Sequence, residues 1–137
     1  MAARVVPDDS TADFGGMVLA GTMGSVVGAY VGGSIGYQLD RAGGCTGDWC
    51  GLGGAFLGAL AGSSLLAGVG VHAVNDSRGS LATGVLGAAL GALGGFSLAA
   101  ATDEPVSILF LPFLQAGAAA IAERATTPRD PGRQEDQ

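Results

Sequence analysis

Long uncharged runs of mostly apolar residues, separated by short polar breaks, dominate this chain. The runs cover residues 14–39, 51–75, 79–102 and 105–122. An α-helix of about 20 mostly apolar residues, within a range of roughly 17–25, can cross the hydrocarbon core of a bilayer. The pattern therefore predicts an all-α, polytopic membrane protein, with four transmembrane helices at about these positions forming one domain over residues 14–122.

Two other fold classes fit this pattern poorly. A soluble helical bundle would show a charged face on each helix, and none of the four runs carries one. A β-barrel would alternate apolar with polar positions, whereas both parities are apolar or small here. Outside the four runs, we expect a polar N-terminal segment at 1–13 and a disordered polar tail at 123–137.

Glycines recur every four residues in the first three predicted helices. These rows are Gly24, Gly28, Gly32 and Gly36, then Gly54, Gly58 and Gly62, then Gly87, Gly91 and Gly95. Residues at this spacing lie on one side of an α-helix. In lipid, where helices associate mainly through van der Waals contacts, small residues at this spacing let two backbones approach closely. We therefore predict that the rows are glycine-zipper packing faces.

The composition narrows the function classes further. Glycine accounts for 26 of 137 residues, charged residues for only 13%, and the formal net charge is −6. The glycines show no three-residue period, which excludes a collagen-like chain. The chain has no lysine and an excess of carboxylates, so we do not expect it to bind nucleic acid.

Two of the glycine-rich segments resemble each other. Residues 51–65 (GLGGAFLGALAGSSL) and 84–98 (GVLGAALGALGGFSL) are identical at ten of fifteen positions. A duplicated helix and a shared compositional bias both account for this. Over about residues 15–122 the chain resembles small bacterial glycine-zipper membrane proteins, and in architecture alone it resembles the four-span Tim17/Tim22/Tim23 family.

The arginines indicate an orientation in the membrane. An N-in, C-in arrangement puts five of the six on the cytoplasmic side: Arg4, Arg78, Arg124, Arg129 and Arg133. Only Arg41 then lies in an outer loop. Positively charged residues favour cytoplasmic segments. Together with the resemblance, this predicts a bacterial inner-membrane protein whose 40–50 loop faces the periplasm.

That loop contains both cysteines, in the sequence CTGDWC. Cys45 and Cys50 lack the CxxC spacing of redox and zinc motifs. We expect them to form a disulfide in an oxidising compartment, with a reduced pair as the alternative. Tyr37 and Trp49 flank the cysteines and fit aromatic anchors at the membrane interface. A loop that recognises a partner is the other interpretation.

Few side chains in the predicted spans could carry chemistry. A proton-relay role for His72 would need a carboxylate at similar depth, and we expect none. Asp76, four residues later, could form an interfacial pair with it, but we favour an ordinary interfacial histidine. Pro112 should kink the fourth helix. Gln115, three residues later, could satisfy the carbonyl freed by the proline or mark a polar contact in an oligomer, and we favour the packing role. We predict no catalytic residues, no metal site and no cofactor.

These observations favour a structural or assembly subunit without catalytic activity. Its expected partners are the lipid bilayer and either copies of itself, as a homo-oligomer, or a larger membrane complex. One alternative is a holin-like or channel-like pore, since glycine rows can line the helix contacts around a pore. A second is a microcin-like secreted toxin, a class with similar small-residue helices and a cysteine pair.

Overall fold

The computed structural model describes residues 13–47, 49–102 and 105–128, and that part of the chain is all-helical. Its elements are α1 (Phe14–Ala42), α2 (Leu52–Val74), α3 (Leu81–Thr102), the short 3₁₀ helix η1 (Pro105–Phe110) and α4 (Leu111–Thr126). Four segments are long and apolar enough to cross a membrane, the fourth being Ile108–Thr126. The predicted all-α fold with four candidate spans is thus confirmed.

The fourth helix begins and ends later than the uncharged run that predicted it. Pro112 lies in the first turn of α4, directly after η1, where a missing N–H group breaks no helical hydrogen bond. The proline therefore lies where a 3₁₀ segment passes into an α-helix, and a kink at this point stays a prediction. At the other end, α4 continues to Thr126. Residues 123–126, which we assigned to the polar tail, are therefore helical.

Side-chain and backbone caps explain where the first two helices begin. The carboxylate of Asp13 accepts a hydrogen bond from the Gly15 N–H group at the start of α1, at 3.2 Å. At the start of α2, the Asp40 carboxylate accepts from the Gly54 N–H group at 3.3 Å. Gly51, directly before α2, has a φ of 88°, a left-handed conformation that favours glycine. The α1–α2 connection is therefore held by contacts from both helices.

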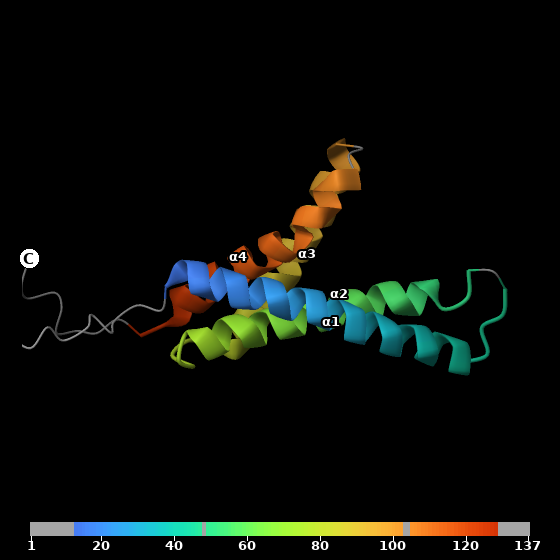
Figure 1. The fold of residues 1–137 in the computed structure, drawn as a ribbon, viewed down its shortest axis with the longest axis horizontal. Coiled ribbons are helices and arrows are strands. Elements are labelled where there is room, and N and C mark those ends of the chain that lie inside the picture. The colour runs from blue at the N-terminus through green and yellow to red at the C-terminus, as the bar shows by residue number, and fades with distance from the viewer. Residues whose placement is uncertain (1–12, 48, 103–104, 129–137) are drawn as a thin grey trace, which may run out of the picture.

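The helices form two hairpins that diverge from a common junction. Figure 1 shows α1 and α2 side by side along their length, whereas the hairpin of α3 and α4 leans away from them. The hairpins meet where α1 and α3 begin and where α2 and α4 end. The buried apolar core lies at this junction and consists of Met17, Ala67, Val71, Ala88, Ala119 and Ala120.

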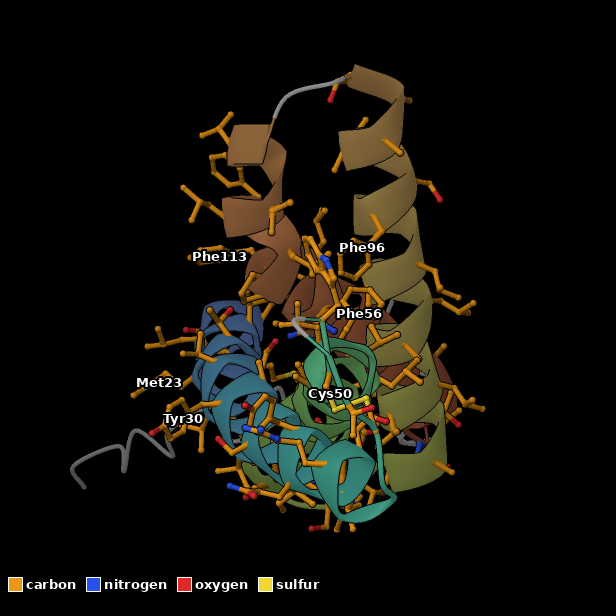
Figure 2. All side chains as sticks on the ribbon, turned by 90° about the vertical axis from the view of Figure 1, so that its right-hand side faces the viewer. Met23, Tyr30, Cys50, Phe56, Phe96 and Phe113 are labelled. Atoms are coloured by element: carbon orange, nitrogen blue, oxygen red, sulfur yellow. A yellow bond between two sulfur atoms is a disulfide. The ribbon has the colours of Figure 1, made fainter. Side chains whose placement is uncertain are left out.

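Most large apolar side chains lie outside this core. Met23, Tyr30 and Phe113 point outward from the helices in Figure 2, and Tyr30 is 79% exposed. Exposed leucines occur on all four α-helices, and exposed valines or phenylalanines occur on α1, α2 and α4. An apolar surface of this extent is unusual for a monomeric protein in water and suits contact with lipid.

Candidate functional site

The glycine rows of α1 and α2 lie against each other's backbone. A Cβ atom added at any α1 row position would come closer than 3.0 Å to a carbonyl oxygen of α2. The facing pairs are Gly24 with Leu66, Gly28 with Gly62, Gly32 with Gly58, and Gly36 with Gly54. The last three pairs are reciprocal, because a Cβ on the α2 glycine would also meet the α1 carbonyl. The structure thus brings together the predicted rows of the first two helices.

The glycine row of α3 packs against α4 and not against the first hairpin. A Cβ at Gly87 would lie 2.7 Å from the Ala118 carbonyl oxygen, and one at Gly91 would lie 2.6 Å from that of Leu114. A Cβ added at Gly95 would lie nearest to the Leu111 side chain. Since α4 has no glycine row of its own, the glycines of α3 pack against alanine and leucine residues of α4.

The predicted disulfide and anchor residues lie at the far end of the first hairpin. Cys45 and Cys50 are at disulfide distance, with their Cα atoms 5.6 Å apart. The Tyr37 hydroxyl accepts a hydrogen bond of 2.8 Å from the Arg41 guanidinium. Trp49 is exposed. That Tyr37 and Trp49 lie at a membrane interface stays a prediction. Of the arginines used to predict orientation, Arg4, Arg129 and Arg133 lie outside the described residues.

Gln115 joins α4 to both helices of the first hairpin. Its side chain is only 1% exposed. The amide oxygen accepts from the Ser25 hydroxyl on α1, and the amide nitrogen donates to Ser63 at 3.0 Å and to Ser64 at 3.4 Å on α2. The Ser63 and Ser64 hydroxyls in turn donate to the Leu60 carbonyl. Because these bonds form within one chain, Gln115 has a packing role, as its position predicted.

A hollow of about 240 Å³ opens beside this polar cluster, between the two hairpins. Ser25, Ser63 and Gln115 line one side of it. Phe56 and Phe96 line another side, with their ring centroids 5.3 Å apart. Figure 2 shows these two rings pointing into the space between the hairpins. The other lining residues are apolar, so the hollow has hydrogen-bonding groups on one wall and apolar side chains on the rest.

A second buried polar contact corrects our expectation for His72. Its Nδ1 atom lies 2.5 Å from Oε1 of Glu123, whose side chain is 0% exposed. The expectation that no buried carboxylate lies at the depth of His72 was therefore wrong. Asp76 was the alternative partner, but its carboxylate oxygen Oδ2 lies 3.9 Å from the guanidinium nitrogen Nη2 of Arg78.

The sequence contained a signal for Glu123 that a charge count misses. The fourth uncharged run ends at residue 122, which placed Glu123 in the tail. Glu123 follows Gln115 by eight residues and Ala119 by four, and a helix puts these spacings on one face. All three side chains are buried on α4. Periodicity carried past the first charged residue would have placed the carboxylate inside the helical domain.

No protein-family model, curated protein or solved structure matches this chain. Among the described residues, no group of three or more histidine, cysteine, aspartate or glutamate side chains could hold a metal ion. The function must therefore be argued from three features: the glycine contacts, the hollow beside Gln115 and the His72–Glu123 pair.

Proposed function

We propose that this chain is a non-catalytic integral membrane protein that acts as a structural or assembly subunit. In this proposal the four helices span a bacterial inner membrane with both ends in the cytoplasm. The observation that carries it is the reciprocal glycine contact between α1 and α2 at three successive levels. In a bilayer, close backbone approach of this kind stabilises a helix pair that lipid gives little hydrophobic reason to form.

The position of the glycine rows supports one further part of the proposal. All three rows are occupied by contacts inside the chain. A homo-oligomer, or a complex with another membrane protein, would therefore form through the larger side chains on the outer surface. Tyr30 and Phe113 are examples of such residues, on α1 and α4. We therefore propose that the glycine rows stabilise the fold of the single chain, whereas the bulky apolar side chains on its outer surface form the contacts with other chains.

Cysteine labelling from each side of the membrane tests the proposed orientation. One variant keeps Cys45 and carries Cys50→Ser; the other adds Ser77→Cys to a Cys45→Ser/Cys50→Ser background. We expect a membrane-impermeant thiol reagent to label Cys45 in intact cells and the residue-77 cysteine only after lysis. The opposite pattern would contradict the orientation, and release of the protein by alkaline carbonate would contradict membrane integration.

Crosslinking in native membranes tests the assembly role. A Tyr30→Cys variant in the cysteine-free background places one thiol on the outer face of α1. We expect disulfide-linked dimers or adducts of defined mass. The matched control is Ser64→Cys, a nearly isosteric change at a buried position of α2, where a thiol should not be available for intermolecular crosslinking. Monomers alone, with linkers of several lengths and positions on all four helices, would rule out assembly.

A pore is the second candidate, and the hollow beside Gln115 is the observation that favours it. Its polar wall of Ser25, Ser63 and Gln115 lies about midway along the candidate spans. Uncharged hydroxyl and amide groups would give a pore little ion selectivity. Conductance across planar bilayers, lost or altered in Gln115→Leu, would support this function. Silence at all protein concentrations would leave the structural role.

A further inference from the structure

We propose that His72 and Glu123 form a proton-binding site where α2, α3 and α4 meet. The 2.5 Å separation of Nδ1 and Oε1 places a hydrogen atom between the two groups, whichever of them formally carries the proton. The inference goes beyond the structural role proposed above and does not depend on it, because it rests on this side-chain pair alone.

The environment of Glu123 favours proton exchange over a purely structural ion pair. Its second carboxylate oxygen, Oε2, is buried and has no hydrogen-bond partner among the described residues. A buried oxygen left without a partner costs free energy while the group is charged. Adding a proton to the pair neutralises the carboxylate or the net charge of the pair. Binding a proton therefore lowers the free-energy cost of burying the carboxylate, which no other described contact of Oε2 lowers.

Two glycines make room for the carboxyl group. A Cβ at Gly79 would lie 2.6 Å from Oε1 of Glu123, and one at Gly84 would lie 3.0 Å from Oε2. Larger residues at either position would displace the carboxylate from the start of α3. The first turn of a helix favours negative charge, so this location accommodates the ionised form as well as the protonated one.

His72 connects the buried carboxylate to the surface of the molecule, two residues before α2 ends. Its side chain is 22% exposed, whereas that of Glu123 is fully buried. A proton from the aqueous phase can reach the imidazole and pass along the short hydrogen bond to the carboxylate. Release follows the same route in reverse. The pair takes up one proton and one unit of positive charge per binding event, so the reaction needs no other reactant.

Among the residues that the structure describes, four other charged groups lie near this end of the molecule. In the α2–α3 loop, Asp76 lies beside Arg78. On α4, the Arg124 guanidinium lies 5.0 Å from the centre of the Phe14 ring. Asp13 caps α1 and is exposed. The residues of α3 include no ionisable side chain.

A single-histidine NMR titration tests the proposal, because the chain contains one histidine. The full chain is labelled with ¹⁵N-histidine in detergent or bicelles and titrated as wild type, Glu123→Gln and Asp76→Asn. We expect Glu123→Gln to move the midpoint of the His72 resonance by about one pH unit or more, as loss of a carboxylate in contact does. Asp76→Asn, which removes an exposed carboxylate four residues away, should move it by less than about 0.3. Equal midpoints in wild type and Glu123→Gln would overturn the proposal.

An infrared measurement keeps the test decisive if Glu123→Gln does not fold. The wild-type chain should show a buried carboxyl C=O band whose intensity follows pH, and His72→Gln should shift the pH at which the band appears. Asp76→Asn should leave the band unchanged. If neither the carboxyl band nor the ring bands of His72 change with pH in the wild-type chain, the pair binds no exchangeable proton and the proposal is overturned. A carboxyl band that His72→Gln does not move would overturn the coupling of the two groups.

Discussion

The two hairpins of this molecule are held together in different ways. Between α1 and α2, glycine meets glycine, and each backbone blocks a side chain on the other. Between α3 and α4, glycine lies on α3 alone and faces alanine and leucine on α4. In the α1–α2 contact the facing atoms belong to the backbone, so no side chain can rotate to make room for a substituent. The α3–α4 contact includes positions, Gly95 above all, where a side chain can adjust.

This difference teaches how four similar glycine-rich segments can have different roles. A reciprocal contact fixes the spacing of α1 and α2 at every level of the row. A one-sided contact leaves α4 free to carry polar residues, and it carries both Gln115 and Glu123 on its buried face. The α1–α2 hairpin thus has the closer backbone contact, and α4 contributes the buried polar side chains that contact it.

The largest effect should come from a branched side chain in the reciprocal contact. Gly58→Val puts three carbon atoms where the Gly32 carbonyl lies. We expect the free energy of unfolding to fall by about 3 kcal/mol or more, because two backbones must separate to make room. Unfolding by SDS in mixed micelles, followed by circular dichroism, measures this. A loss as small as that of Gly95→Val would erase the distinction between the hairpins.

A smaller loss should follow when α4 is disconnected from the first hairpin. Gln115→Ala removes the hydrogen bonds to Ser25, Ser63 and Ser64. We expect the free energy of unfolding to fall by about 1–2 kcal/mol, because interhelical hydrogen bonds are lost and a buried hydroxyl is left unpaired. The same unfolding assay applies, with Ser97→Ala as the control, since Ser97 bonds only within its own helix. Equal stability of the two variants would mean that Gln115 does not join the hairpins.

The smallest effects should appear at neighbouring glycines of α3. Gly95→Ala presses on the Leu111 side chain, which can rotate, so we expect a loss of no more than about 1 kcal/mol. Gly94→Ala meets no atom within 4 Å. It should stabilise the helix by about 0.5 kcal/mol, because alanine is the better helix former. The unfolding assay resolves the order of the two variants, and a reversed order would contradict the one-sided contact.

The sequence predicted the helices well, because span length and the absence of charge depend only on local composition. It also picked out ten glycines that lie in helix contacts, since a four-residue period fixes one helix face. It missed Gly68 and Gly70, where an added Cβ would come within 3.0 Å of Val85 and Ala20. Which rows meet is a tertiary property: rows in α1 and α2 pair, and the row in α3 faces Ala118 and Leu114. Nothing in the spacing of the three rows distinguishes these pairings.

The His72–Glu123 pair shows a different limit. Charge marked the end of the fourth apolar run, so Glu123 was read as tail. Burial of a carboxylate depends on a partner 51 residues away in the chain and on space left by Gly79 and Gly84. Neither condition leaves a local pattern. Buried charge is therefore the part of this molecule that sequence reasoning was least able to locate.

The most direct test of the central claim compares two adjacent glycines of α1. Gly32→Ala would bring a Cβ against the Gly58 backbone, whereas Gly33→Ala would place one 3.3 Å from the Ala55 carbonyl oxygen. Both changes alter helix propensity equally, so their difference isolates the contact between the helices. We expect Gly32→Ala to lower the free energy of unfolding by about 2 kcal/mol more than Gly33→Ala does. Equal losses at the two positions would contradict backbone contact between α1 and α2.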